Sequence, residues 1–378
     1  MFRPYSTEQM QETYWSLGDQ WWKQIIDGDC HEFGPEVFDK GLHSGAVEPG
    51  FLKSLYNGML YASDELGKPL SIEFYKTLHQ QLCNHFAGDA NDTLMSSEGT
   101  GKYRTKNVKS DFALKYCMDA EMLHHYLCVE ISGKIERAIT YRSTHFHVKS
   151  DNTSKDVYEA WKKGTKTYYP QKYRFSKKFI SKADEVKDLE GFFKKEAISS
   201  AIAVQAFEKS WGNKINSLNE YILKISQDLE CPRFVMFSLI ELNSSGESGL
   251  KSIKIDYLKL EPHVMNSVIE KLFHHFNTSI QEPQSRKSKL TLIADLYQKL
   301  DWLHPFLDGQ GRVDLVLLSK LLTENGFHPA ILDDPYFSST STLSEWVEEL
   351  EKGLIAWEKV HDEINAQPRT SKRCAARL

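Results

Sequence analysis

The stretch that most constrains the fold is residues 288–325, where two apolar helical patterns flank a short glycine-containing segment. Apolar residues at three- and four-residue spacing predict a helix over 288–303, and a second pattern predicts a helix over 312–325 that ends at Gly326. The apolar residues of the first pattern are Leu292, Ile293, Leu296, Leu300 and Leu303. Helices this apolar need other helices to bury them, so the stretch predicts a helical core.

The rest of the chain predicts mostly helices with a small strand element. Further helical patterns cover residues 7–27, 71–86, 113–130, 196–228, 263–276 and 344–360. The turn at 243–249 lies between two strand patterns and predicts a hairpin over 233–260, and a further strand is predicted over 137–148. The expected fold class is therefore mainly α, with a β-hairpin and a large mixed α/β region in the middle.

Composition excludes several classes of protein. The 378 residues are 40% hydrophobic and 26% charged, which is typical of a folded soluble chain of two or three units. A net charge of -5 argues against a protein whose main role is to bind nucleic acid. No apolar run reaches the roughly 18 residues of a membrane span, and no secretory signal opens the sequence. Six cysteines without a CxxC pair indicate a reducing compartment, so we expect a cytoplasmic protein.

The segment between the two apolar helices, LHPFLDGQGRVDL (303–315), carries more chemistry than a helix connection needs. His304 has a near-neutral pKa and can accept a proton from a hydroxyl group. Asp308 is a hard oxygen ligand that suits Mg²⁺. Phe306, which alternates with these residues, is expected to point into the core. These residue types suit the attack of a hydroxyl group on a phosphate.

The glycines of the segment complete this pattern. Gly309 and Gly311 lie at the start of the second helix, where free N–H groups and the helix dipole favour an anion. Arg312 adds a charged, forked phosphate contact. The alternative from the residues alone is a glycine-rich helix–helix turn with an incidental histidine.

HPFLDGQGR (304–312) resembles the Fic-family signature His-x-Phe-x-(Asp/Glu)-Gly-Asn-Gly-Arg-x-x-Arg. FYKTLHQQL, GTGKYRTKNV, LEPHVMNSVIEKLF and LLSKLLTENGFHPAIL resemble neighbouring family segments, so the resemblance covers about 65–110 and 250–335. It implies a Fic-type helical core with a hairpin flap. The implied roles are general base for His304, buried anchor for Phe306, Mg²⁺ ligand for Asp308, and nucleotide phosphate binding for Gly309, Gln310, Gly311 and Arg312.

The resemblance implies a transferase that moves AMP from ATP to a Ser, Thr or Tyr hydroxyl of a protein substrate, whereas a few family members transfer phosphocholine, UMP or phosphate. Two departures bear on the donor. Gln310 replaces the family asparagine, and Leu315 replaces the second arginine, which contacts the outer phosphates of ATP in the family. CDP-choline or another nucleoside-diphosphate donor therefore stays open, and so does a catalytically impaired module that binds a nucleotide or a protein.

Many family members carry an inhibitory (Ser/Thr)-x-x-x-Glu-(Gly/Asn) helix. Glu98-Gly99 is the nearest match, but Leu94 stands where the hydroxyl residue belongs. We therefore expect an enzyme without a built-in inhibitory segment. This absence and the large insertion resemble family members that bacteria inject into host cells, which would place the chain in a host cytosol without a secretory signal.

The expected organisation has five parts. They are an N-terminal helical segment (1–60), a first core part (61–110), an insertion for target docking (111–245), a second core part with flap and motif (246–365) and a basic tail (366–378). Residues 161–182 hold eight Lys/Arg and six aromatics with no acids, and could dock an acidic partner surface or form a solvated face. The strand 251–260, with Ile253, Ile255 and Tyr257, is expected to pair with the target segment.

Overall fold

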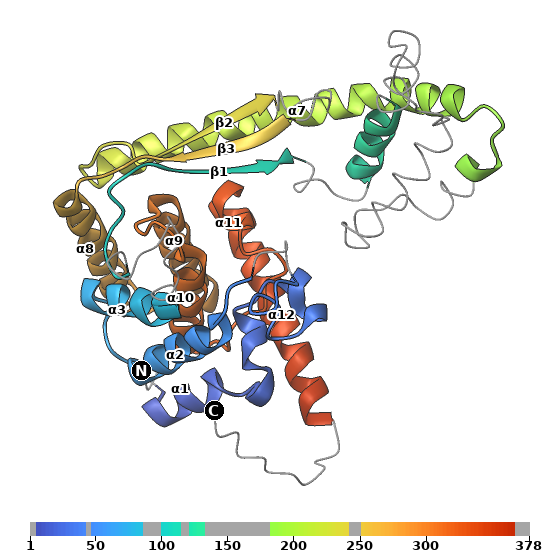
Figure 1. Cartoon of the computed structure of the whole chain (residues 1–378). Helices are drawn as coiled ribbons and strands as arrows, with labels where there is room; N and C mark the ends of the chain where they lie inside the picture. Colours follow the sequence, from blue (N-terminus) through green and yellow to red (C-terminus); the bar gives the residue numbers. More distant parts are fainter. Residues whose placement is uncertain are drawn as a thin grey trace. The chain divides into compact units, whose positions relative to one another are not determined.

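The computed structural model describes residues 5–42, 47–85, 100–114, 121–132, 182–241 and 251–366. The chain divides into two compact units (Figure 1). The core unit comprises Met1–Val108, Lys224–Val235 and Tyr257–Leu378, and the inserted unit comprises Lys109–Leu223 and Met236–Asp256. Most of the hairpin thus belongs to the inserted unit, whereas the sequence analysis assigned its second half to the core.

The described residues are mainly helical, with one small antiparallel three-stranded sheet, as the sequence predicts at this level. In the core unit the α-helices are α1 (Thr7–Tyr14), α2 (Phe51–Asp64), α3 (Ile72–Cys83), α8 (Pro262–Ser279), α9 (Arg286–Leu303), α10 (Gln310–Glu324), α11 (Phe337–Thr340) and α12 (Leu343–Ala366). Two 3₁₀ helices, η1 (Gly18–Gln24) and η2 (Gly28–Phe33), follow α1.

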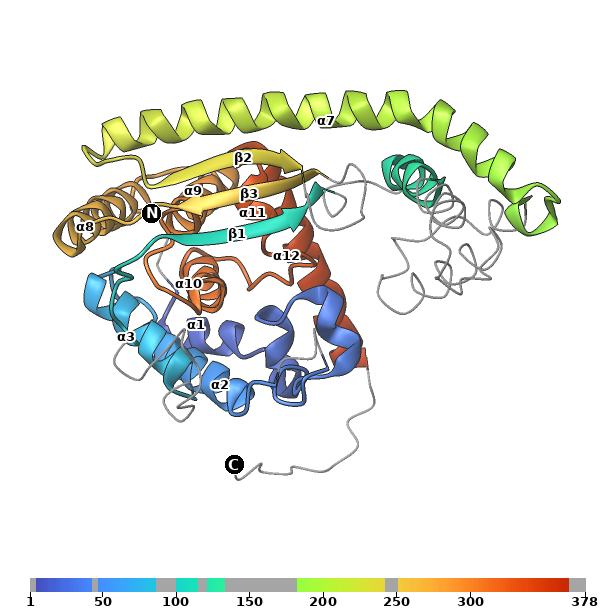
Figure 2. The same ribbon diagram turned by 45° about the horizontal axis from the view of Figure 1, so that its top comes forward.

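Helix α10 lies at the centre of the core unit (Figure 2) and contacts α1, α2, α3 and α9. Every residue from 313 to 323 is buried, which explains why its sequence is apolar on nearly all sides. Helix α9 in turn packs against α8, α11 and α12. The two helices of the most constraining sequence stretch therefore form the middle of the core, as expected.

Local signals set several helix starts. The Ser6–Gln9 capping box begins α1, the Ser71 hydroxyl accepts a hydrogen bond from the Phe74 N–H at the start of α3, and Pro262 is the first residue of α8. The expected single helix over 7–27 is wrong, because α1 ends at Tyr14 and the chain continues as 3₁₀ helix. Gly18, with a φ of 54°, interrupts the right-handed α conformation there.

The inserted unit contains most of α7 (Leu189–Asp228), a helix over 121–132, and most of the strands β1 (Val108–Ala113), β2 (Val235–Glu241) and β3 (Lys251–Tyr257). The helix expected over 113–130 is described only from 121, and Val108–Ala113 is a strand instead. Its core joins helix 121–132 to α7 through the buried residues Leu123, Leu127, Ile131, Phe193 and Val204, among others.

The strand order β1-β3-β2 corrects the expectation that β3 presents a free edge to a target. β3 is the central strand, so β1 and β2 already use both of its hydrogen-bonding edges. The side chains of Ile253, Ile255 and Tyr257 are at most 4% exposed, so they cannot dock a partner. On the β2 edge, the Asn219 amide donates to the Phe237 carbonyl oxygen and accepts from the Phe237 N–H.

Several sequence predictions fall on residues that the structure does not describe. These are the strand over 137–148, the basic segment 161–182 up to residue 181, the Glu98-Gly99 pair and the tail from residue 367. Among the described helices, none combines the length and the apolar character that crossing a membrane requires.

Candidate active site

His304 closes α9 and begins the loop that leads to α10. Its N–H donates to the Leu300 carbonyl oxygen, and its backbone is left-handed, with a φ of 44°. A non-glycine residue rarely adopts this conformation, and such strain gathers at functional sites. The left-handed residue turns the chain sharply out of α9, so that the segment 304–309 leaves the helix axis.

Arg104 holds the start of this loop. Its buried guanidinium donates to five main-chain carbonyl oxygens at 2.6–3.4 Å. The acceptors are Leu303, His304, Lys106, Tyr257 and Leu258. The Arg104 N–H also donates to the Pro305 carbonyl oxygen at 2.8 Å. One arginine thereby fastens the end of α9 to the segment that follows β3, and it fixes the backbone of the candidate base.

The His304 imidazole stacks on the Tyr257 ring, with centroids 4.2 Å apart. The near-neutral pKa expected for His304 is wrong: burial, and secondarily the positive charge of Arg104, lower its pKa to about 3, which makes the imidazole a weak base. The imidazole is therefore neutral at pH 7, which is the state that can accept a proton.

His79 of α3 holds the second half of the loop. Its Nδ1 accepts from the Gly101 N–H at 2.8 Å, so its Nε2–H donates to the Asp308 carbonyl oxygen at 3.0 Å. The bond from the Gly101 N–H requires an unprotonated Nδ1 and therefore the neutral ring, and burial lowers the pKa of His79 to about 4. The ring also stacks on Phe306, which is fully buried and also contacts Tyr75. Phe306 thus ties the loop to α3.

Gly309 joins the loop to α10 in a left-handed conformation with a φ of 73°. A Cβ at this position would lie 2.4 Å from the Cys83 Sγ, so both the backbone angle and the space require glycine. The Asp308 carboxylate accepts from the Gly309 N–H at 2.6 Å. The Gly309 N–H expected to bind a phosphate is therefore already taken by Asp308, and the Gly309 N-cap itself offers no side chain, so an anion at this end depends on the N–H groups from Gln310 onward.

Gln310 points away from this helix end. Its amide donates to the Tyr75 hydroxyl and to the Asp314 carboxyl, both at 2.7 Å, and its side chain is buried. Burial, and secondarily the nearby Asp301, raise the pKa of Asp314 well above its usual range. The expected phosphate contact from the Gln310 amide is therefore absent from this arrangement: the side chain fills the interface between α3 and α10.

Arg312 makes an ion pair that the sequence analysis did not foresee. Its Nη2 lies 2.6 Å from Oε1 of Glu48, and the same oxygen lies 2.6 Å from Nε2 of His85. The guanidinium also lies over the Phe51 ring, 4.7 Å from its centroid. A carboxylate of the chain itself thus holds the arginine expected to bind phosphate.

Leu315 lies three residues after Arg312, where the resemblance implies a second arginine. It is 6% exposed and lies on α10 together with the buried Leu318 and Leu322, so it belongs to the helix core as predicted. A positively charged side chain at this position would be buried in the helix core, away from solvent.

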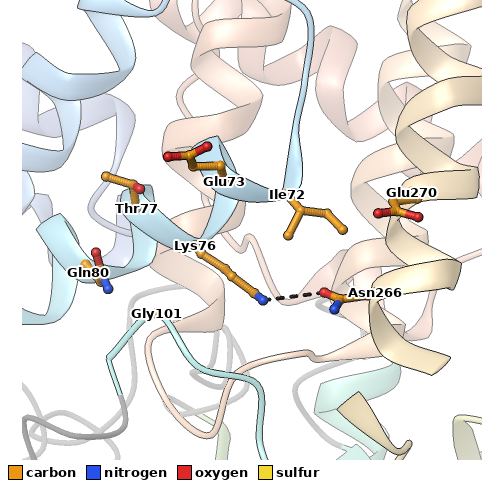
Figure 3. Close-up of a pocket in the computed structure, with 8 residues that line it drawn as sticks. All are labelled: Ile72, Glu73, Lys76, Thr77, Gln80, Gly101, Asn266 and Glu270. Atoms are coloured by element: carbon orange, nitrogen blue, oxygen red, sulfur yellow. Dashed lines mark hydrogen bonds between the residues drawn. The ribbon is translucent and has the colours of Figure 1, made fainter. Parts of the chain in front are cut away.

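A separate pocket of about 440 Å³ lies between α3 and α8 (Figure 3). In it, the Lys76 ammonium donates to the Asn266 side-chain oxygen at 3.4 Å. The residues that line it are Ile72, Glu73, Lys76, Thr77, Gln80, Gly101, Asn266 and Glu270. Its α3 residues lie on a different helical face from Tyr75, His79 and Cys83, which face the motif, so the pocket does not contain the candidate base.

The sequence analysis missed the residues that support the motif. Arg104 and His79 lie inside segments whose resemblance was recognised (GTGKYRTKNV and FYKTLHQQL), so their position was a usable signal. Glu48 lies in VEPG before α2 and carries no recognisable pattern. Its contact with Arg312 arises only from the packing of α2 beside α10.

Comparisons with known proteins add no family assignment. No protein-family model matches the chain, and no curated protein is significantly similar to it.

Proposed function

We propose that the chain is a Fic-type transferase that attaches a nucleotide-derived phosphoester to a protein hydroxyl group, with AMP from ATP as the first candidate. One observation carries the proposal: a neutral histidine with strained backbone precedes an uncapped helix N-terminus on a loop held at both ends. A turn that merely connected two helices would need neither the Arg104 clamp nor the His79 bonds.

In the proposed reaction, the target hydroxyl donates its proton to neutral His304. Its oxygen forms a bond to the α-phosphorus, the bond from that phosphorus to the bridging oxygen breaks, and pyrophosphate leaves. The N–H groups at the start of α10 hold phosphate oxygens. Asp308 is a half-buried carboxylate on the same loop and fits a Mg²⁺ ligand, and a bound Mg²⁺ would offset phosphate charge.

Two observations make a donor with a shorter phosphate chain a better candidate here than in a family member that has the second arginine. Leu315 supplies no second cation, and Glu48 already pairs with Arg312. A nucleoside diphosphate derivative such as CDP-choline requires fewer positive charges, so phosphocholine transfer is the second candidate. The same ion pair is also compatible with a catalytically impaired module that binds a nucleotide or a protein.

The test is transfer of label from ATP labelled at the α-phosphate, or from CDP-choline labelled in choline, to proteins of a cell lysate. The masses of purified labelled proteins then identify the adduct. We expect His304→Ala to reduce transfer by about 10²–10⁴-fold, since general-base catalysis is worth that much. Circular dichroism of the variant shows whether it folds.

An adduct that forms equally well with the His304→Ala variant would refute the mechanism. If neither donor yields an adduct but calorimetry detects nucleotide binding, the binding module becomes the better assignment. If neither transfer nor binding occurs, the proposed function is wrong.

A further inference from the structure

Three side chains that bind metals well meet in the inserted unit, within the part of the chain that the structure describes. His124 and Cys128 lie on the helix over 121–132, and Glu196 lies on α7. Because His124 and Cys128 are four residues apart, they occupy one face of their helix. One ligand atom from each of the three residues lies within 4.8 Å of the other two.

We propose that His124, Cys128 and Glu196 form a zinc-binding site. The proposal is independent of the candidate active site, because it rests on side chains of a different unit. It adds a metal of a different class from the Mg²⁺ considered for Asp308.

The distances suit zinc. Bonds of about 2.0–2.3 Å in a tetrahedral arrangement place two ligand atoms roughly 3.3–3.8 Å apart. The His124 Nε2 and the Cys128 Sγ are 3.8 Å apart. All three ligand atoms lie within 4.8 Å of one another, so small side-chain movements are enough to bring them to bonding distance from one ion.

The chemistry of the ligands selects the metal. A thiolate and an imidazole are soft or borderline ligands, which favour zinc over Mg²⁺ or Ca²⁺. On binding, the Cys128 thiol releases its proton to solvent, and the thiolate and the Glu196 carboxylate then balance the charge of the ion. A neutral site suits this position, because Cys128 is fully buried in the apolar core of the inserted unit.

Zinc at this site would cross-link two segments of the inserted unit. The core shared by helix 121–132 and α7 is small, and it includes Leu123, Leu127 and Phe193. Three protein ligands leave a fourth position for water or an exogenous ligand. We therefore expect zinc to stabilise this helix pair.

The test uses the full chain, freed of metal with a chelator and titrated with Zn²⁺ by calorimetry. We expect one equivalent to bind with a Kd below about 1 μM. Cys128→Ser, His124→Ala and Glu196→Gln should each weaken binding by at least about 100-fold, since losing even an indirect partner of a ligand costs 10–100-fold. Co²⁺ should produce a sulfur-to-cobalt charge-transfer band that Cys128→Ser removes.

His125→Gln is the matched control, because this neighbouring histidine hydrogen-bonds Ser200 instead. It should bind Zn²⁺ with an unchanged Kd. Absence of saturable Zn²⁺ binding, or equal binding by wild type and Cys128→Ser, would overturn the proposal. If Cys128→Ser does not fold, the half-buried Glu196→Gln variant provides the test. If this variant binds Zn²⁺ with the wild-type Kd and shows the wild-type rise in melting temperature on adding Zn²⁺, the proposed site is wrong.

Discussion

The loop 304–309 and the first turns of α10, residues 310–315, are adjacent in sequence but differ in what their side chains do. The loop is held from outside through its main chain, by Arg104 at His304 and by His79 at Asp308. At the helix start, Gln310 and Asp314 turn inward and bond each other within the core, whereas Arg312 pairs with the partly exposed Glu48. Side chains whose backbone is held by other residues remain available for chemistry, whereas side chains that fill a core do not.

This difference accounts for Gln310 and Leu315, the two residues that depart from the signature the motif resembles. Both Gln310 and Leu315 lie in the inward-turned part, where packing decides the residue. The loop retains the histidine, aspartate and glycine of the signature.

Leu315→Arg places at a core position the arginine that the resemblance implies there. We expect a loss of about 4 kcal/mol in the free energy of unfolding, because a buried charge without a partner costs several kcal/mol. Leu315→Met is the control and should cost less than about 1.5 kcal/mol. Chemical denaturation measures both. A stable Leu315→Arg protein that gains affinity for ATP would show that this helix start belongs to the nucleotide site.

Arg104→Met removes the clamp on the loop. Five main-chain carbonyl oxygens, buried or partly buried, lose a donor, and we expect a cost of about 3 kcal/mol together with loss of transfer activity. Arg286→Met, at an exposed arginine of α9 with one such bond, should cost less than about 1 kcal/mol. Equal denaturation midpoints for the two variants would mean that Arg104 does not hold the loop.

His79 should make stability depend on pH. Its pKa in the folded chain is lowered to about 4, so the unfolded chain binds more protons between pH 6.5 and pH 4. Stability should therefore fall by up to roughly 3 kcal/mol as the pH falls through this window. The lowered pKa of His304 also reduces stability as the pH falls. The pKa of Asp301, raised to about 6, has the opposite effect, because the folded chain then binds more protons than the unfolded chain.

The difference between wild type and His79→Gln isolates this contribution. Glutamine keeps an acceptor and a donor, but it does not titrate. Urea denaturation of both proteins at pH 7 and pH 4.5 should show a smaller pH effect in the variant. Parallel pH curves would contradict the assignment of a neutral, doubly bonded His79.

Gly309→Ala tests the joint between the two regions. A left-handed alanine and a Cβ close to Cys83 should together cost about 2 kcal/mol. Gly311→Ala is the matched control, since its Cβ would meet nothing nearer than 3.8 Å. Adding Cys83→Ala to Gly309→Ala should recover only the part of the lost free energy of unfolding that comes from the clash with the Cys83 side chain. Thermal unfolding of the four proteins measures these terms, and equal effects at both glycines would show that the joint imposes no special constraint.

Glu48→Gln should release Arg312 for phosphate. The pair is partly exposed, so we expect a gain of about 1 kcal/mol, or roughly fivefold, in affinity for ATP or CDP-choline. Glu36→Gln removes an exposed pair with Lys40 and serves as control. Calorimetry measures the affinity. Unchanged or weaker nucleotide binding by Glu48→Gln would show that Arg312 does not face the donor.

Much of the fold followed from local patterns. The apolar periodicity located α3, α8, α9, α10 and α12, because a helix that buries one face repeats apolar residues at fixed spacing. The sequence did not predict the break after Tyr14 or the strand Val108–Ala113. The aromatic residues around Gly18 fit the pattern of one continuous α-helix as well as that of two shorter helices. The strand Val108–Ala113 depends on pairing with a strand far away in the sequence, which its own residues do not reveal.

Of the candidate site, the sequence located the loop between α9 and α10, and the roles it predicts for the loop residues stay predictions. It could not assign Gln310 to a buried network with Tyr75, because that contact joins residues far apart in the chain. For the same reason it missed the Glu48–Arg312 pair and the central place of β3.

By itself, then, the sequence determined the helical core and the chemistry available between residues 304 and 312, since both depend on residues close together along the chain. Tertiary structure alone decided which of these groups are neutral, which are held and which are buried. Those properties depend on solvent exclusion and on partners such as Arg104, His79 and Glu48, which folding brings to the motif from distant segments.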